Sequence, residues 1–535
     1  MRKQLSWLAP DCVVEPLVDS WHAWAYLVPP LQAGMMIRSR HIPVMESFVS
    51  APDLHVEALK NPDLIGGPYL SCSPENVGRV ESLLESTRKS SKPLLDLAEA
   101  YVQLEDELRR VPNSMSLEPL YVSVPDPIKG YVELVYDRWH QPHARILEAL
   151  LYRSENFERT RQSVTLERMD FDRREFVFST PRFPSDTPTR KQVRLNAPFD
   201  EKALELLFRS RTQGQELGLL IETLARFVDG DVAALEAMFV SKEPARVPKK
   251  DMAGAMAVRY FGHACVLIEG DGFSVLIDPL IPGQGSGPQR FSHADLPDRV
   301  DYVLLTHTHQ DHVVLESLLE LRHRVGTFVV PRGGGGNLID PSLKELLGAA
   351  GFNRVREVGD LDVIDLEADA KITALPFLGE HGDLDVRTKS AYAISSGGKC
   401  IVALADSNGL EPLVYERVSR DIGPVDLLLI GMECSGAPVS WLYGPLLGSP
   451  LRRRADQSRR LSGSDCERAL SLVQALKAKK VFVYAMGAEP WCTFMTSVHY
   501  TDASEPIVQS NKFVAACRAQ SIEAGRLYGA AEFTV

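Results

Sequence analysis

The spacing of hydrophobic and polar positions divides this chain into two regions with different patterns. In the first region, hydrophobic residues recur at helical spacing over 75–110 and 201–228, which predicts amphipathic helices. We expect 75–110 to form a helical hairpin that breaks at or near Pro93, because proline interrupts helical hydrogen bonding. Short hydrophobic runs predict strands within 118–136 and 163–180, including Leu120–Val124 and Phe176–Phe178.

In the second region, short hydrophobic runs alternate with helical patterns. The tight-turn sequence Gly270-Asp271-Gly272 predicts a hairpin between the first two runs. Strands are predicted at Val258–Glu269, Phe273–Ile277, Tyr302–Leu305, Phe328–Val330, Lys371–Leu375, Ala391–Ser395, Cys400–Ala405, Val425–Gly431 and Val481–Tyr484, and helices at 313–322 and 464–478. This order predicts two sheets covered by helices on their outer faces, an α/β/β/α sandwich.

A polar segment, residues 242–254, separates the two regions and carries two prolines and a Lys-Lys pair. A chain of 535 residues is also too long for a single hydrophobic core. We therefore predict an α+β chain of two domains. A mixed α/β N-terminal domain covers 1–245, and the sandwich domain covers 256–535.

Composition narrows the functional class. The net charge of −12 argues against a broad nucleic-acid-binding surface. No hydrophobic run approaches the roughly 20 residues that span a bilayer, so we expect no membrane segment. Eight scattered cysteines without a Cys-x-x-Cys pair indicate reduced thiols, which predicts a cytoplasmic protein.

The strongest candidate for chemistry is a cluster of ligand-type residues directly after the predicted strand Tyr302–Leu305. The chain has thirteen histidines, and three of them fall within the six residues His307-Thr308-His309-Gln310-Asp311-His312. His307 and His309 are two apart, so both can point to one side of an extended loop. Asp311 and His312 can then serve a second ion nearby. The cluster predicts a site for two metal ions.

Further donors follow two later strands, and they leave the metal open. Asp406 ends one strand, and the adjacent Glu380 and His381 follow another. If Glu380 is the ligand, two histidines and a carboxylate favour iron that activates dioxygen. If His381 is the ligand instead, three histidines suit zinc and hydrolysis. Asp278 closes the hairpin and is either an acceptor for a ligand histidine or a turn residue.

Over about 256–490 these motifs resemble the metallo-β-lactamase superfamily. The resemblance implies that His307 and His309 bind one ion together with a third donor. It also implies that Asp311 and His312 bind the other ion and that Asp406 lies between the two. The hydrolases of that superfamily carry a later histidine that is hard to place here, since no histidine directly follows Val481–Tyr484.

A longer resemblance covers the whole chain. The N-terminal region, the sequence Gly-Glu-His-Gly-Asp at 379–383 and an insertion after Gly431–Cys434 resemble the dinuclear-iron β-hydroxylases of nonribosomal peptide antibiotic pathways, above all those of chloramphenicol-type biosynthesis. The resemblance implies a monooxygenase with two iron ions, dioxygen as co-substrate and an external two-electron donor. Its substrate would be an aminoacyl group, L-p-aminophenylalanine, held on the phosphopantetheine of a synthetase carrier domain. Glu380 and Asp406 would be its catalytic ligands.

Two other parts of the chain are candidate regions for binding a partner protein. The insertion at 441–460 begins with aromatic and apolar residues and ends with five arginines, which suggests either a lid and a basic patch for a carrier domain or a solvated loop with a packed base. The N-terminal domain is expected to serve carrier recognition and homodimer formation. The alternative function is a dizinc hydrolase of an ester, lactone or phosphoester, and a metal site kept only for stability is a third possibility.

Overall fold

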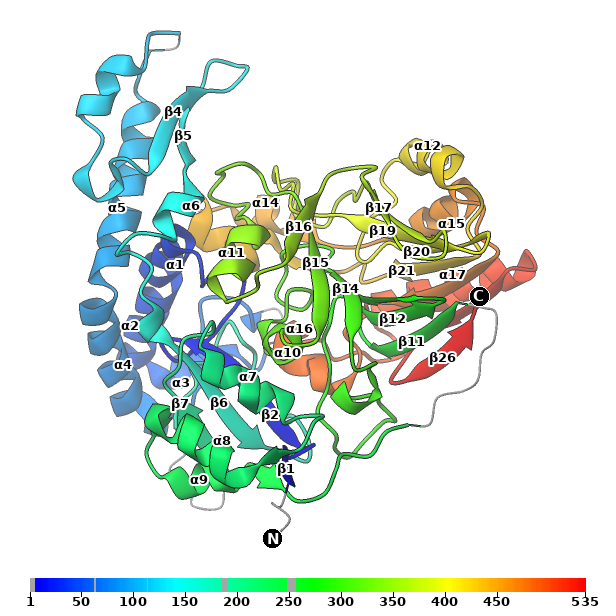
Figure 1. The fold of residues 1–535 in the computed structure, drawn as a ribbon. Coiled ribbons are helices and arrows are strands. Elements are labelled where there is room, and N and C mark those ends of the chain that lie inside the picture. Colours follow the sequence, from blue (N-terminus) through cyan, green and yellow to red (C-terminus); the bar gives the residue numbers. More distant parts are fainter. Residues whose placement is uncertain (1–4, 62–63, 113, 185–190, 248–255) are drawn as a thin grey trace.

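The computed structural model describes residues 5–61, 64–112, 114–184, 191–247 and 256–535. Figure 1 shows the N-terminal region on the left and a two-sheet sandwich on the right. Within the described residues, no helix is long and apolar enough to cross a membrane. The polar segment expected to divide the domains lies partly outside the described residues, at 248–255.

The N-terminal region is built around a five-stranded antiparallel sheet in the order β3-β2-β6-β7-β9. Its strands are β2 (Cys12–Val18), β3 (Trp21–His22), β6 (Gln162–Arg168), β7 (Gln192–Leu195) and β9 (Val228–Asp229), with a small sheet of β1 (Leu5–Leu8), β8 (Gln215–Glu216) and β10 (Phe239–Val240) and a hairpin of β4 (Val132–Tyr136) and β5 (Pro142–Ile146). Its helices are α1 (Pro30–Met36), α2 (Ile42–Ser50), α3 (Pro52–Ala58), α4 (Val77–Ser90), α5 (Lys92–Leu108), α6 (Glu148–Leu151), α7 (Lys202–Arg209), α8 (Leu217–Leu224) and α9 (Val232–Glu236).

The predicted helical hairpin is confirmed, because α4 and α5 occupy 77–90 and 92–108. Pro93 lies in the first turn of α5, where a missing backbone N–H costs nothing. Figure 1 shows α5 running along the left edge, with the β4–β5 hairpin projecting beyond the rest of the molecule.

The helical prediction for 201–228 is confirmed for α7 and α8, but β8 separates the two helices and Val228 begins a strand. Two strand predictions for this region are wrong. Leu120–Val124 falls largely in a 3-10 turn that begins beside Pro119. Phe176–Phe178 forms no strand; Phe178 is buried with its ring 4.5 Å from that of Trp24. The two runs also differ in burial, since Tyr121 and Val122 are exposed, so a short hydrophobic run alone decides neither burial nor backbone conformation.

The C-terminal domain is the expected α/β/β/α sandwich, made of two seven-stranded sheets. The first sheet contains, in order, β16 (Val355–Val358), β15 (Val325–Pro331), β14 (Val300–Leu304), β13 (Phe273–Ile277), β12 (Cys265–Gly270), β11 (Ala257–Gly262) and β26 (Ala531–Thr534). The second contains β17 (Val363–Asp365), β18 (Lys371–Leu375), β19 (Ala391–Ser396), β20 (Lys399–Ala403), β21 (Leu427–Gly431), β24 (Lys480–Tyr484) and β25 (Glu523–Arg526). The helices are α10 (Leu315–Leu321), α11 (Leu343–Ala349), α12 (Pro412–Ile422), α13 (Val439–Tyr443), α14 (Arg453–Ser458), α15 (Cys466–Ala475), α16 (Thr493–Thr496) and α17 (Glu505–Ala519), and β22 (Ala437–Pro438) pairs with β23 (Arg460–Leu461).

One error in the strand prediction matters for the site. The run Val258–Glu269 was expected to be one strand, but β11 and β12 are separate antiparallel strands joined by a turn at His263-Ala264. Gly262 and His263 both have positive φ, +108° and +48°, which reverses the chain at this point. Val481–Tyr484 is also not the last strand, since β25 and β26 follow it.

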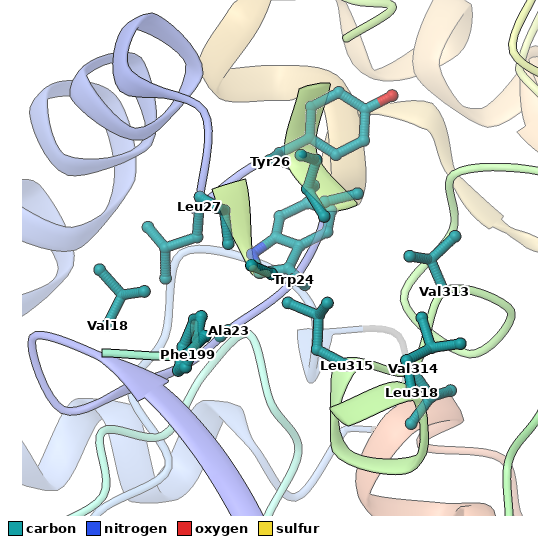
Figure 2. Close-up of a cluster of buried hydrophobic side chains, with 14 of the residues drawn as sticks. Val18, Ala23, Trp24, Tyr26, Leu27, Phe199, Val313, Val314, Leu315 and Leu318 are labelled. Carbon is teal, nitrogen blue, oxygen red and sulfur yellow. The ribbon is translucent and has the colours of Figure 1, made fainter. Parts of the chain in front are cut away.

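Both faces of the first sheet are apolar. Along β12, Val266 and Ile268 pack in the cluster between the two sheets, whereas Cys265 and Leu267 point to the cluster on the outer face. That outer cluster is continuous with the core of the N-terminal domain. Figure 2 shows Leu315 of α10 in one group with Trp24 and Phe199. The two domains therefore share a hydrophobic core.

Candidate metal centre

The predicted metal-binding residues all lie at one edge of the sandwich. In the first sheet β13 and β14 are parallel, and the ligand loop follows β14. In the second sheet β18 and β20 run in the same direction, with Glu380 after the first and Asp406 after the second. Strand ends that meet at one edge bring together residues far apart in sequence, on a rigid support.

The structure places His307, His309 and Glu380 in one group whose potential ligand atoms all lie within 4.8 Å of one another. The Oε2 atom of Glu380 is 2.9 Å from Nδ1 of His309 and 3.7 Å from Nε2 of His307. All three residues are buried.

A second group contains His307, His312 and Asp406. The Oδ2 atom of Asp406 is 2.9 Å from Nε2 of His312 and 3.9 Å from Nε2 of His307, so this carboxylate lies between the two groups. The Oδ2 atom of Asp311 approaches Nε2 of His312 to 4.0 Å. The arrangement is that of two neighbouring ion sites with one shared carboxylate.

The chemistry of the donors fits metal ions. Buried polar atoms are normally hydrogen-bonded. Several buried atoms of this site have no hydrogen-bond partner among the described residues, including Nε2 of His307, Nε2 of His312, Oε2 of Glu380 and Oδ1 of Asp406. Three carboxylates also share the buried site, which is costly without compensating positive charge. Two divalent cations would satisfy both the free lone pairs and the excess negative charge.

Hydrogen bonds away from the centre fix two of the histidines. Nδ1 of His312 lies 2.8 Å from Oδ2 of Asp278 and donates to it, which leaves the Nε2 lone pair free. Asp278 also accepts from the backbone N–H of Thr306, at 2.8 Å, and from its hydroxyl, at 2.6 Å. Because that hydroxyl proton is used, Oγ1 of Thr306 accepts from Nδ1 of His307, 3.0 Å away. The structure thus gives Asp278 the acceptor role that the sequence left open.

Tyr443 connects His309 to His381. Its hydroxyl lies 3.2 Å from Nε2 of His309 and 2.8 Å from Nδ1 of His381. A hydroxyl that accepts from His309 and donates to His381 leaves the Nδ1 lone pair of His309 facing Glu380. The neutral His381 then carries its proton on Nε2, and the ring supports Tyr443 from behind.

His263 is a site residue that sequence reasoning missed. Its Nε2 is 3.2 Å from Oδ2 of Asp311, and the two form a further group with His312. The backbone N–H of Gly487 donates to Nδ1 of His263, at 3.1 Å, so a neutral ring carries its proton on Nε2. His263 is therefore placed to donate to Asp311. The signal was a histidine at the end of a buried strand, and it was hidden by treating β11 and β12 as one strand.

Burial and carboxylates dominate the electrostatics of the metal-free site. Burial lowers the pKa of His307 far below its ordinary value, so this ring is neutral at physiological pH. Burial also raises the pKa of Glu380, to about 7, against the attraction of His309. Burial opposes a charge on His312, but Asp406, Asp311 and Asp278 outweigh it and raise its pKa. A proton can thus occupy the site in place of a metal.

A cavity of about 250 Å³ opens over the two groups. Its wall includes apolar side chains from the 441–460 insertion and from the loop after β24, such as Trp441, Leu442 and Met486. A larger cavity of about 560 Å³ shares Ser497 and Val498 with it and is lined on the other side by residues 171–176 of the N-terminal domain. The metal cavity thus combines apolar side chains with polar and charged ones, which suits an organic substrate that carries polar groups.

Comparison with known proteins agrees with this geometry. A family model described as the N-terminal domain of diiron non-haem β-hydroxylases matches residues 7–244, and one for a β-lactamase superfamily domain matches 257–436. The chain is 37% identical over 515 residues, 95% of each protein, to the 4-amino-L-phenylalanyl-[CmlP-peptidyl-carrier-protein] 3-hydroxylase of Streptomyces venezuelae. It superimposes with a TM-score of 0.91 and 35% identity, over the whole of both chains, on the crystal structure of CmlA, a diiron β-hydroxylase from the same organism.

Fold and site together define a dinuclear metalloenzyme with a metallo-β-lactamase fold. More narrowly, the chain belongs to the diiron non-haem β-hydroxylases, and it is an enzyme whose cofactor is a pair of iron ions. The alternative of a dizinc hydrolase is not favoured, since the match extends over the N-terminal domain as well as the catalytic one.

Proposed function

We propose that this enzyme hydroxylates the β-carbon of an aminoacyl group, L-p-aminophenylalanine, held as a thioester on the carrier domain of a peptide synthetase in chloramphenicol-type biosynthesis. The observation that carries the proposal is the likeness, over 95% of both chains, to a relative named for this reaction. The two irons supply dioxygen activation, with two electrons from an external donor protein. The protein contributes ligand geometry, substrate position and exclusion of water.

We assign the ligands from the hydrogen bonds around them. His307, His309 and Glu380 would hold one iron, and Asp311 and His312 would hold the other. Asp406, whose carboxylate lies near both His307 and His312, would serve both ions. His381 is not a ligand in this assignment, because it belongs to none of the groups whose potential ligand atoms lie within 4.8 Å of one another. Carboxylate-rich ligand sets are typical of iron that activates dioxygen.

The remaining residues of the site act by orientation. Asp278 holds His312, with its Nε2 lone pair toward the centre. Tyr443 contacts Nε2 of His309 and so leaves the Nδ1 of that ring toward the centre. Because Asp278 and Tyr443 are buried, these hydrogen bonds are shielded from competing water and keep the ligand geometry fixed.

The route for the tethered substrate is the larger cavity beside the metal cavity. The two share a wall, and the larger one lies where the N-terminal domain meets the loop after β24. A phosphopantetheine arm entering there would carry the aminoacyl group to the irons. The N-terminal domain would then contribute to carrier recognition as well as to the proposed homodimer.

The basic patch proposed for carrier docking is smaller than the sequence suggests. Arg459 donates to the carbonyl of Gly382, at 2.7 Å, and Arg460 donates to the carbonyls of Ser435 and Gly436. These two arginines hold the insertion in place. Arg452–Arg454 are exposed and remain available to an acidic carrier surface.

Charge reversal tests this patch. Changing Arg452–Arg454 to Glu is expected to weaken carrier binding by about tenfold at low salt and by less at high salt, because exposed charges are screened. The control reverses Arg417 and Arg420, which are exposed on α12. Equal affinity in both variants, measured by titration calorimetry, would remove the patch from the proposal.

A cytoplasmic location is proposed from the cysteines. All eight are free, which suits a reducing compartment.

The reaction itself is tested with the loaded carrier. Protein reconstituted with ferrous iron should bind about two irons per chain and, when reduced, transfer labelled oxygen from dioxygen enriched in oxygen-18 to the β-carbon. Mass spectrometry of the released aminoacyl group measures the label. Two zinc ions per chain as purified, with hydrolysed thioester and no labelled oxygen, would overturn the proposal.

A further inference from the structure

The metal cavity contains a carboxylate that belongs to none of the three ligand groups. Asp311, Glu380 and Asp406 line the cavity and are all in those groups, but Glu433 also lines it and is in none. Glu433 follows β21 by two residues and is half-buried, so it is enclosed by protein and still accessible from the cavity.

One oxygen of Glu433 is committed to the backbone. Its Oε1 accepts from the N–H groups of Gly436, at 2.9 Å, and Ser435, at 3.2 Å. These bonds fix the turn that leads into the insertion and orient the carboxylate. They also stabilise its charge, since backbone donors favour the ionised form.

The other oxygen is weakly satisfied. The hydroxyl of Tyr500 lies 3.4 Å from Oε2 of Glu433 but only 3.0 Å from the carbonyl oxygen of Met486. One hydroxyl proton cannot serve both acceptors fully, and the shorter contact is the one to Met486. Oε2 of Glu433 therefore retains the capacity to accept a strong hydrogen bond.

Glu433 has no cationic partner in the described part of the chain. Its side-chain oxygens contact backbone N–H groups and Tyr500, and the nearby Arg460 donates to backbone carbonyls and to Gln457 instead. Burial raises the pKa of Glu433, and Asp406 adds to this effect. A carboxylate in this position is best stabilised by a positive charge brought in by a ligand.

The position of Glu433 suggests which group of a substrate carries this positive charge. The backbone N–H of Gly463 donates to the carbonyl oxygen of Glu433, at 2.8 Å. A Cβ placed on Gly463 would lie 3.5 Å from the carbonyl oxygens of both Asp406 and Glu433, so these residues flank the same point. Glu433 is thus next to the shared carboxylate of the metal centre.

We propose that Glu433 binds the α-ammonium group of the aminoacyl substrate and so selects for amino acids over simple carboxylic acids. In such a substrate the amino nitrogen and the β-carbon are bonded to the same α-carbon. A carboxylate beside the metal centre can therefore bind the amino group while the β-carbon faces the irons. An α-amino group with a pKa near about 8 is largely protonated at neutral pH. This inference rests on the proposed function.

The test compares Glu433→Gln with the unchanged enzyme on three loaded carriers. One carries the p-aminophenylalanyl group, the second the corresponding arylpropionyl group, which lacks only the α-amine, and the third the phenylalanyl group, which lacks only the ring amine. Affinity is measured by titration calorimetry with the diiron enzyme, and kcat/KM by mass spectrometry. Glu505→Gln, which removes the same charge from an exposed position at the start of α17, is the matched control.

We expect Glu433→Gln to lower affinity for both carriers that have an α-amine by about 10- to 100-fold, as for other charge-assisted hydrogen bonds. Affinity for the arylpropionyl carrier should stay within about twofold, because it lacks the group that Glu433 binds. Iron content and carrier binding by Glu505→Gln should be unchanged.

Other outcomes would overturn the inference. Equal losses of affinity for all three carriers would make Glu433 a structural turn residue only. A loss of affinity that is absent only for the phenylalanyl carrier would show that Glu433 binds the ring amine. No loss on any carrier would exclude a role in binding. The proposed function fails separately, if the unchanged enzyme neither binds nor hydroxylates any loaded carrier.

Discussion

At the scale of single residues, a hydrogen bond at one ring nitrogen decides which nitrogen of each histidine faces the proposed metal centre. His307 and His312 donate through Nδ1 to neighbouring oxygens and keep a free Nε2. His263 has the opposite arrangement, since its Nδ1 accepts from Gly487. Histidines that look equivalent as donors in the sequence thus have different roles.

The same reasoning gives a prediction for the adjacent pair Glu380 and His381. Glu380→Ala removes a proposed ligand, so iron content should fall from about two to about one per chain and hydroxylation should be lost. His381→Gln should keep both irons, because a glutamine oxygen can still accept from Tyr443. Elemental analysis after reconstitution and gel filtration measures the difference. Loss of iron in His381→Gln alone would transfer the ligand role to His381.

A second residue, Glu148, predicts a pH dependence of stability away from the metal centre. Burial raises its pKa from 4.5 to about 7, and Asp340 and Glu345 add to the shift; its Oε2 accepts from the N–H of Ser342, at 2.9 Å. Below both pKa values, Glu148 is protonated in the folded chain and in the unfolded chain. As the pH rises from 4.5 to about 7, the unfolded chain loses its proton first, so burial of Glu148 progressively lowers the free energy of unfolding.

Glu148→Gln removes this penalty and keeps an acceptor for Ser342. The variant should be more stable than the unchanged protein at about pH 8, by up to about 3 kcal/mol, and should gain little at about pH 5. Chemical denaturation at both values measures the effect. Glu118→Gln, an exposed site, is the control. An equal gain at both pH values would show that ionisation of Glu148 is not the cause.

The sequence predicted six residues that the structure brings together, but it could not complete the site. The ligand loop and Asp406 are visible because donors end buried strands. Glu380 and His381 could not be separated, since both are donors and only the folded structure places Glu380, and not His381, in a group with His307 and His309. His263 and Glu433 depend on a turn and on a cavity that no local pattern encodes.

At the scale of elements, helix α10 links the metal loop to the rest of the protein. It begins at Leu315, three residues after His312. The N–H of Val313 bonds to the carbonyl of His309, at 2.9 Å, so loop and helix form one unit. The inner side of α10 packs against residues of the N-terminal domain, as Figure 2 shows.

Leu315→Ala should therefore disturb both stability and the metal site. Loss of a fully buried leucine costs about 2–5 kcal/mol of unfolding free energy. Iron should also leave faster in the presence of a chelator, because the loop loses its support. Leu472→Ala is the matched control, since Leu472 is equally buried but lies on α15 in a separate cluster. Similar rates of iron loss in both variants would contradict the link.

Elements were predicted well wherever a hydrophobic run had a clear boundary. Most strands of the sandwich and the α4–α5 hairpin fall within a few residues of their expected positions. The failures share a cause. Aromatic runs such as Phe176–Phe178 are buried by packing between domains, and the β11–β12 turn contains His263 and Ala264 rather than the usual turn residues.

At the scale of the whole molecule, the two domains are held by charge as well as by apolar packing. Arg174 of the N-terminal domain is bound to Glu316 of α10, at 2.7 Å, and Arg211 is bound to Glu320, at 2.6 Å. Both pairs are buried and lie on the helix that follows the metal loop. Nothing in the sequence pairs these residues, because they are more than a hundred positions apart.

The Arg211–Glu320 pair gives a test of this coupling. Arg211→Met leaves Glu320 buried without its partner, which should cost about 3–5 kcal/mol. Arg211 also donates to the carbonyl of Ala9, at 3.0 Å, so part of the loss is a backbone contact. Burial already raises the pKa of Glu320 against the attraction of Arg211. Without Arg211 the pKa rises further, and the variant should lose more stability at about pH 8 than at about pH 5.

The double variant Arg211→Met with Glu320→Leu separates the cost of an unpaired charge from the worth of the pair. A buried ion pair replaced by apolar residues of similar volume is often close to neutral, so the double variant should recover most of the lost stability and its pH dependence. Thermal unfolding and iron retention measured together decide the outcome. If the double variant stays as unstable as Arg211→Met but retains iron, the pair holds the domains without supporting the metal loop. If it recovers both, α10 transmits the domain contact to the metal centre.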